Sequence, residues 1–303
     1  MVCVQESTYR ALLGPKIQIF KLKVSSLLLL PWPLTRAKSL LGALGLLLTF
    51  FATFLLALSY SQAWAWQDLD QGLELGFFPL EDRAKAITIV RINPANYGFL
   101  LCSQALEQTK PKDLEQWAKE KGLVCAINAS MYIKDGQTST GYLREDKKIN
   151  NPRHNPRFGA FFVAHPDLEG LPEVDLLERQ DPNLKETLAH YRLVIQNYRL
   201  IASDQRILWP KVGERHAVAA VGLDKQGRVL FIYCGTPTTP HALAQELLRL
   251  PLELKNAMYV EGGSEAGLYI AAQSDESRLF PFLSFRLPLP NVLGVYKKND
   301  SGK

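Results

Sequence analysis

Short apolar runs separated by turn-forming residues restrict the fold of this chain more than any other feature. From residue 86 onward, runs of Val, Ile, Leu, Phe and Ala recur between Gly, Pro, Asn and Asp residues. Runs of this length are typical of β-strands, whereas amphipathic helices need longer segments with a 3.6-residue period. We predict strands at residues 86–92, 98–102, 123–130, 158–164, 191–196, 217–224, 228–235, 257–261, 267–271 and 291–296.

Two segments carry helix signals instead. Residues 111–122 open with a proline, hold acids early and lysines late, and end at a glycine. Residues 241–250 are amphipathic and lie between Pro240 and Pro251. Many short strands with two or three helices favour an α+β fold, as a single domain with a mixed β-sheet core.

Composition divides the chain into four parts. Residues 1–65 form a basic and apolar leader, and the polar, charged residues 66–85 are typical of a linker. The domain itself is expected at 86–296, followed by a polar tail at 297–303. Within the domain, residues 166–190 are acidic and interrupted by prolines, which predicts a surface insertion.

The leader predicts export. Leu40–Leu58 is a run of 19 residues without charge, preceded by Arg36 and Lys38 and followed by Ala63-Trp64-Ala65. This order is typical of a signal peptide with a small-residue cleavage site, while the length of the run also suits an uncleaved membrane anchor. Either alternative leaves the basic flank in the cytoplasm and places the body outside it, in the periplasm or at the cell surface.

The charge distribution argues against nucleic acid as a partner. The chain has a formal net charge of +5, with 35 basic and 30 acidic residues. Residues 1–65 hold six of the basic residues and one of the acidic ones, which leaves 29 of each in the body. A neutral body has no need of an anionic polymer as partner, and membrane contact is expected only through the leader.

No cofactor or metal is predicted. The five histidines include no pair spaced by four residues, and no CxxC motif is present. The body holds Cys102, Cys125 and Cys234, each in or beside an apolar segment. Buried thiols or a single disulfide are both compatible with this pattern.

The strongest candidate for chemistry is a carboxylate at the end of an apolar strand. Glu261 follows Ala257–Val260 and is followed by Gly262, Gly263 and Ser264. Desolvating such a carboxylate is unfavourable unless it has a partner or a function, although the glycines by themselves would equally suit a tight turn. The pattern disfavours a serine-hydrolase elbow, which needs a glycine two residues before and two residues after the serine and a helix after it, whereas here residue 266 is alanine and the next element is extended.

Further polar residues lie at the ends of other predicted strands. Arg215 and His216 come directly before the strand at 217–224, and an arginine fork suits carboxylate or phosphate oxygens. Asn128 closes a buried strand and Tyr132 follows it; an asparagine can bind sugar hydroxyls or simply form a turn.

Taken in order, these motifs resemble the phosphodiester glycosidase family, whose best-known activity removes the covering N-acetylglucosamine from mannose 6-phosphate tags. The resemblance extends over about 86–296. The motifs that carry it are Asn128-Ala129 with Tyr132, the glycine-led strand Gly141-Tyr142-Leu143, Arg215-His216, Gly235 and Thr239 before a helix, and Glu261-Gly262-Gly263-Ser264.

Four positions depart from the family pattern. Glu261 stands in place of aspartate, His216 in place of threonine, Ala129 in place of glycine, and Cys234 where relatives often carry aspartate. A carboxylate displaced by about 1 Å can lose roughly 100-fold in rate. The alternative to a hydrolase is therefore a protein that binds an envelope glycan or phosphodiester polymer without cleaving it.

The resemblance implies hydrolysis of a sugar 1-phosphodiester. The leaving group is then a phosphate monoester, which needs charge stabilisation more than a proton, so that one carboxylate and one arginine could suffice. We assign Glu261 as base or nucleophile and Arg215 as the phosphate clamp, and expect both to converge with Asn128 in one pocket. The predicted substrate-binding residues are Asn128, Tyr132, Gly141, His216, Thr239, Gly262, Gly263 and Ser264.

Overall fold

The structure is a computed structural model and describes residues 66–80, 86–271 and 287–298. The predicted leader at 1–65 and most of the predicted tail at 297–303 lie outside these residues. No helix in the described ranges has the length and apolar character needed to cross a membrane. The described residues all belong to one compact unit, in agreement with a single domain.

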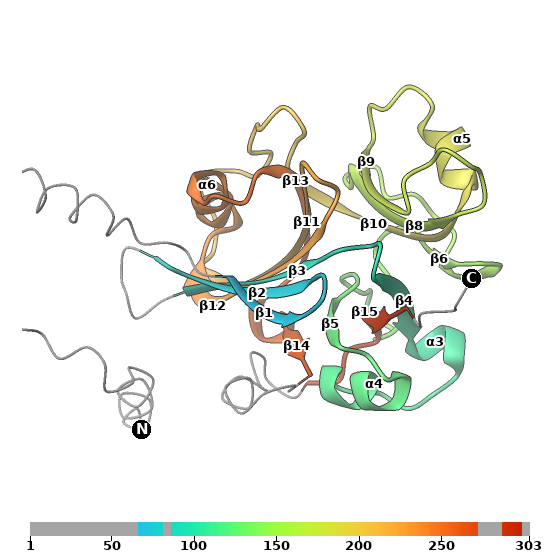
Figure 1. Cartoon of the computed structure of the whole chain (residues 1–303). Helices are drawn as coiled ribbons and strands as arrows, with labels where there is room; N and C mark the ends of the chain where they lie inside the picture. The colour runs from blue at the N-terminus through green and yellow to red at the C-terminus, as the bar shows by residue number, and fades with distance from the viewer. Residues whose placement is uncertain (1–65, 81–85, 272–286, 299–303) are drawn as a thin grey trace, which may run out of the picture. The chain divides into compact units, whose positions relative to one another are not determined.

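The unit is built from two β-sheets (Figure 1). The larger sheet contains β1 (Trp66–Asp70), β2 (Leu73–Pro79), β3 (Ala86–Ile92), β6 (Leu143–Glu145), β7 (Lys148–Asn151), β8 (Ala160–Pro166), β9 (Val174–Glu178), β10 (Tyr191–Ile201), β11 (His216–Asp224), β12 (Val229–Thr238) and β13 (Leu254–Gly262). Its order is β1-β2-β3-β12-β11-β13-β10-β6-β7, and β8 joins β10 to β9.

The smaller sheet has the order β14-β5-β15-β4. Its strands are β4 (Tyr97–Ser103), β5 (Cys125–Asn128), β14 (Leu268–Ile270) and β15 (Asn291–Lys297). All ten predicted strands are therefore present, with shifts of a few residues at their ends. This agreement follows from the clear turn residues that bound each apolar run.

Four α-helices lie in the described ranges: α3 (Gln104–Glu107), α4 (Leu114–Lys121), α5 (Leu184–Ala189) and α6 (Pro240–Arg249). Both predicted helices are confirmed. The first begins after Asp113, whose side chain accepts a hydrogen bond from Gln116 N–H in a capping box, and it ends at Gly122 in the left-handed conformation. The second begins after Thr239, whose side chain accepts from Ala242 N–H.

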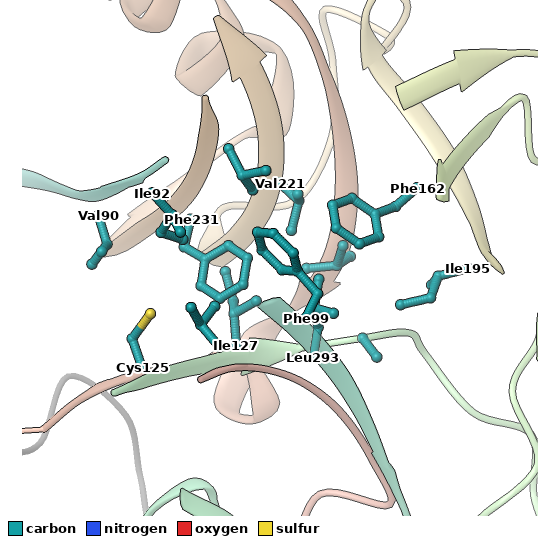
Figure 2. Packing of buried hydrophobic residues seen from close by; sticks show 14 of the residues in the cluster. Val90, Ile92, Phe99, Cys125, Ile127, Phe162, Ile195, Val221, Phe231 and Leu293 are labelled. Carbon is teal, nitrogen blue, oxygen red and sulfur yellow. The ribbon is translucent and has the colours of Figure 1, made fainter. Parts of the chain in front are cut away.

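The main hydrophobic core lies between the two sheets. Figure 2 shows Phe99, Ile127 and Leu293 of the smaller sheet packed with Phe162 and Phe231 of the larger one. A second cluster lies on the opposite face of the larger sheet, beneath α6, and a third lies between the smaller sheet and α4. Each residue of the larger sheet therefore faces either the inter-sheet core or the outer face, and this choice decides which site residues can meet.

The prediction of a mixed sheet is wrong. Every strand pairing among the described residues is antiparallel. Antiparallel neighbours can be joined by tight turns, such as residues 225–227 between β11 and β12, whereas parallel neighbours need long crossovers. The fold remains α+β, but it consists of two packed antiparallel sheets.

The prediction of a linker at 66–85 is also wrong for its described part. Residues 66–79 form the β1–β2 hairpin, which pairs with β3. The acids that made this segment resemble a linker are paired in the fold: Glu74 lies 3.4 Å from Arg91, and Asp70 accepts a hydrogen bond from Tyr97. Residues 81–85 lie outside the description.

The predicted surface insertion at 166–190 is more integral than expected. It contributes β9, which pairs with β8, and the short helix α5. Val174 and Leu176 of β9 are buried in the inter-sheet core, while the intervening side chains are only half-buried. The five residues of β9 alternate between buried and half-buried side chains, but the surrounding acids and prolines made this short strand difficult to predict from the sequence.

Candidate active site

A β-bulge directs Glu261 between the two sheets. Ala220 pairs with Tyr259, whereas Ala219 pairs with Glu261, so that Val260 has no partner on β11. Paired residues on neighbouring strands lie on the same face, and Ala219 belongs to the inter-sheet core. Without the bulge, alternation would place Glu261 on the outer face with Tyr259. Bulges often redirect a side chain in this way beside a functional site.

The carboxylate of Glu261 is buried and its pKa is strongly raised. Only 7% of the residue is exposed. Burial, and to a smaller extent the charge of Glu265, raise its pKa to about 7, although its Oε1 accepts a hydrogen bond of 2.9 Å from Gly262 N–H, which acts in the opposite direction. A carboxyl group with this pKa can both accept and release a proton near neutral pH.

Glu265 supplies a second carboxylate that sequence reasoning missed. It ends the 3-10 helix η1 (Gly263–Glu265), which follows β13 directly. The pKa of Tyr132 is raised to about 12 by burial, by a side-chain hydrogen bond with Glu265, and by the charges of Glu265 and Glu261. Tyr132 therefore lies with the two glutamates, and the only sequence signal for Glu265 was its spacing of four residues from Glu261.

Asn128 holds the loop that carries Glu265. Its Nδ2 donates to Glu265 O at 2.9 Å, and its Oδ1 accepts from Gly267 N–H at 2.8 Å. The side chain is almost fully buried, with 1% of the residue exposed. These bonds connect β5 of the smaller sheet to the loop that follows β13, so Asn128 positions the second carboxylate.

Gly262 lies where no side chain fits. A Cβ atom on Gly262 would lie 2.1 Å from Tyr259 Oη and 2.5 Å from His216 Cε1. The backbone here can therefore approach its neighbours only because residue 262 has no side chain. Gly263 differs, because a Cβ would meet nothing within 4 Å there, but its φ of +73° lies in the left-handed region.

The proton on His216 decides whether the N–H of Gly263 is available. His216 Nδ1 lies 2.7 Å from Ala217 O and 3.3 Å from Gly263 N. One nitrogen cannot donate to the carbonyl and accept from the N–H at the same time. The shorter contact places the proton on Nδ1, which leaves the N–H of Gly263 able to bind an oxygen of a ligand.

Arg215 lies at the same end of the larger sheet as the glutamates. It is exposed, and its Nε donates to Pro237 O at 3.3 Å. Arg215 directly precedes β11 and lies three residues before Val218, the partner of Gly262. Within the described residues it forms no ion pair with Glu261. Its convergence with Glu261 in one pocket stays a prediction.

Of three other predicted substrate-binding residues, Thr239 and Gly141 have a structural role in the fold, and Ser264 is exposed. Thr239 caps α6, as described above. Gly141 is buried, and a Cβ there would lie 2.4 Å from Gln196 O, so close packing explains this glycine. Ser264 is exposed in η1. Gly235 of the Gly235–Thr239 motif is also exposed.

Two buried polar atoms beside Asn128 have no hydrogen-bond partner among the described residues: Ser130 Oγ and Asn197 Oδ1. Asn197 is fully buried, and its Nδ2 donates to Ala129 O at 2.8 Å. It pairs with Ala160 of the inter-sheet core, so it faces the same side as Glu261. Buried polar atoms without partners are rare in folded proteins, and near a reactive carboxylate they can indicate where a polar ligand binds.

A family model for phosphodiester glycosidase matches residues 121–296 of the chain. The chain belongs to the phosphodiester glycosidase family. The matched region contains both glutamates, Tyr132, Asn128 and Asn197, and so covers the whole cluster described above. The resemblance identified from the sequence motifs is thereby confirmed.

Two solved structures show the same fold. The catalytic domain of zebrafish N-acetylglucosamine-1-phosphodiester alpha-N-acetylglucosaminidase, auto-inhibited by its pro-peptide, aligns with a TM-score of 0.55 and 16% identity over 77% of this chain and 86% of that one. A hypothetical protein from Synechocystis aligns with a TM-score of 0.54 and 12% identity over 77% of this chain and 63% of that one. A search of curated proteins found no significant match.

For a phosphodiester glycosidase, this arrangement combines a carboxyl group of shifted pKa with several free polar groups. Glu261 can exchange a proton, and Glu265 lies near both Glu261 and Tyr132. The unpartnered Ser130 and Asn197 can bind hydroxyl groups, and the N–H of Gly263 is available to a ligand when the proton of His216 lies on Nδ1. No group of three or more His, Cys, Asp or Glu side chains suited to a metal ion occurs in the described ranges.

Proposed function

We propose that the protein hydrolyses a sugar 1-phosphodiester bond, with Glu261 as the reacting carboxyl group. Family membership supports the class of substrate, and the zebrafish relative is named for a sugar 1-phosphodiester. The single observation that carries the assignment of Glu261 is its burial at the end of β13 with a pKa of about 7. Perturbed carboxyl groups of this kind are concentrated at functional sites.

Glu261 acts in this proposal as the base that takes a proton from the attacking water. At neutral pH about half of its carboxyl groups are ionised, which balances basicity against availability. The departing phosphate monoester carries negative charge, and the exposed Arg215 at the same end of the larger sheet can stabilise that charge. Gly263 N–H binds one of its oxygens.

Ser130 and Asn197 bind the sugar hydroxyls. Both side chains carry a buried polar atom without a partner, and Asn197 faces the same side of the sheet as Glu261, so a bound sugar would complete their hydrogen bonding. Glu265 lies close enough to Glu261 for its charge to raise the pKa of Glu261. It is a candidate for a second carboxylate beside the one expected from the sequence, because many glycosidases cleave a glycosidic bond with a pair of carboxyl groups.

The test is turnover of chromogenic sugar phosphodiesters by the purified protein and by its Glu261→Gln variant. The amide keeps the shape of the side chain but cannot act as a base, so we expect turnover to be lost. For the parent protein, kcat/KM should rise with an apparent pKa of about 7 and level off above it. Full activity of Glu261→Gln, with several sugars tested, would refute the assignment.

The alternative is a protein that binds an envelope glycan or phosphodiester polymer without cleaving it. The departures at positions 216, 234 and 261 favour this alternative. Binding of such a polymer with no release of products by parent protein or by Glu261→Asp, the variant with the family residue, would support it.

We further propose that the body lies outside the cytoplasm, with the leader as signal peptide or anchor. The support is the uncharged run Leu40–Leu58 behind Arg36 and Lys38.

A further inference from the structure

We infer that the protein has a second ligand site, which binds a phosphate-bearing sugar on the outer face of the larger sheet. A cavity of about 540 Å³ lies between β6 and α5. Its lining includes the rings of Tyr142 and His154, the cations Arg144 and Lys185, and the apolar side chains Leu184 and Leu188. Cavities of roughly 300–1,000 Å³ are typical of small-molecule sites.

The cavity is cationic. Arg144 is held in place because its Nη2 donates to Leu188 O at 2.9 Å and also to Tyr191 O, while its buried Nε has no partner. Lys185 is exposed and forms no ion pair with any described residue. None of the lining residues is acidic, and the exposed Glu186 beside Lys185 is not part of the lining. Two cations without an acid favour an anionic ligand.

The surface beside the cavity extends this positive charge. Lys147, Lys148, Arg153 and Arg157 are exposed and form no ion pair within the described residues. This stretch has two acids: Glu145 accepts a hydrogen bond from Leu101 N–H at 3.0 Å, and Asp146 lies 3.9 Å from Arg192. Because acidic and basic residues balance over the body as a whole, this local excess is a property of the region around the cavity.

The aromatic lining favours a ring-shaped ligand. Tyr142 and His154 lie with ring centroids 4.6 Å apart at 30°, and His154 also contacts Phe161 at 5.7 Å. Burial and the nearby charge of Arg179 lower the pKa of His154, which disfavours a positive charge on its ring. Flat rings beside the apolar Leu184 and Leu188 can pack against the C–H face of a sugar, while the cations bind its phosphate.

The cavity is separate from the carboxylate site. Arg144 pairs with Val194, which packs with Phe161 and Leu188 in a small cluster on the outer face. Leu143 and Ile195, the adjacent pair, face the inter-sheet core on the side of Glu261. A ligand in the cavity therefore lies across the sheet from Glu261, and it can hold a second unit of a sugar-phosphate polymer or a free sugar phosphate.

Calorimetric titration of the full-length protein with Glu261→Gln, which removes turnover, tests the site. The probes are α-D-glucose 1-phosphate, inorganic phosphate, methyl α-D-glucoside and a sugar-phosphate polymer. We expect glucose 1-phosphate to bind more tightly than phosphate or the neutral glucoside. Tighter binding of the polymer than of glucose 1-phosphate would identify a polymer as the natural source of the ligand.

Variants in the exposed lining separate this site from the active site. Lys185→Glu and His154→Ala should each weaken binding of glucose 1-phosphate by about tenfold or more. Lys225→Glu, at an exposed lysine of the β11–β12 turn that does not line the cavity, should leave binding unchanged. Lys185→Glu in the parent protein should leave turnover of a small chromogenic phosphodiester unchanged. The binding experiment does not depend on turnover, so a protein without the proposed activity could still bind glucose 1-phosphate at this site. Unchanged binding in both lining variants, or equal affinity for inorganic phosphate, would overturn the inference.

Discussion

Glu261 pairs with Ala219 across a β-bulge, and this pairing places its carboxylate between the two sheets. Ala219 belongs to the inter-sheet core, whereas Ala220, the partner of Tyr259, belongs to the cluster beneath α6. The extra residue, Val260, interrupts the alternation of side chains along β13, so that Tyr259 and Glu261 lie on opposite faces of the sheet. Glu261 thereby lies near Glu265 and Tyr132.

The burial of Glu261 predicts a stability difference that depends on pH. An unfolded glutamate ionises near 4.5, whereas in the fold the pKa of Glu261 is about 7. Between these values the folded state holds more protons, so Glu261 lowers the stability as the pH rises through this interval, and the loss is complete above about 7. Glu261→Gln lacks this loss. Relative to the parent, the variant should be more stable by roughly 3 kcal/mol at pH 8 and by little at pH 4.

Denaturant unfolding of parent and variant at pH 4, 5.5 and 8 measures this difference. A difference that stays constant across the three pH values would show that Glu261 titrates near its ordinary value.

A matched pair of asparagines tests the proposed sugar contacts. Asn197 and Asn256 are both buried, both face the inter-sheet core, and each Nδ2 donates to a carbonyl at 2.8 Å while the Oδ1 has no partner. Asn197→Leu and Asn256→Leu should therefore reduce stability similarly, by about 1–3 kcal/mol. Only Asn197→Leu should raise the KM for the phosphodiester. Asn197 precedes Tyr198, the partner of Tyr259, and so lies near the Glu261 end of β13, whereas Asn256 lies five residues from Glu261. Equal effects on KM in the two variants would contradict the role of Asn197.

Ser130→Ala should separate binding from stability. Its Oγ is buried without a partner, so removing it should leave the thermal midpoint unchanged or higher. Substrate binding should nevertheless weaken, because the hydroxyl is expected to bind the sugar. Ser139→Ala is the control: Ser139 is equally buried, but its Oγ accepts from Gly141 N–H, so this change should lower the midpoint. A lower thermal midpoint of Ser130→Ala with an unchanged KM would contradict a role of Ser130 in substrate binding.

The two glycines after Glu261 should respond differently to alanine. Gly262→Ala brings a Cβ to 2.1 Å from Tyr259 Oη and should destabilise the protein by about 1–3 kcal/mol. Tyr259→Phe removes that oxygen and should partly rescue the variant in a double-mutant cycle. In Gly263→Ala the new Cβ meets no atom within 4 Å, but the φ of +73° is unfavourable for alanine. The variant should therefore lose roughly 1 kcal/mol in free energy of unfolding, whether or not Tyr259 is replaced. If Gly262→Ala lowers the free energy of unfolding equally in the parent and in the Tyr259→Phe variant, the clash with Tyr259 Oη does not cause the loss.

Reporter fusions after residue 303 test the topology proposed from the leader. Arg36 and Lys38 precede the uncharged run, so a periplasmic reporter should be active and a cytoplasmic one inactive. Deleting residues 1–65 should abolish the periplasmic signal. Strong activity of the cytoplasmic reporter in the full-length fusion would contradict export.

The local elements of this protein were determined by its sequence. The turn residues around the apolar runs located ten of the fifteen strands in the described residues, and the proline, acid and glycine signals located α4 and α6, because these features act within a few residues. The position of Glu261 at the end of β13 was likewise legible, since a run of four apolar residues stops at it.

Only the tertiary structure decided which residues meet. The hairpin at 66–79 looked like a linker because its acids find their basic partners in distant strands, such as Arg91 for Glu74. Glu265 and Asn197 gave no clear signal, because their role depends on loop and strand pairings more than 60 residues apart, as between Asn197 and Ala129. The face of Glu261 depends on one bulge opposite β11, and a shift of a single residue in register reverses which side of a sheet a side chain faces.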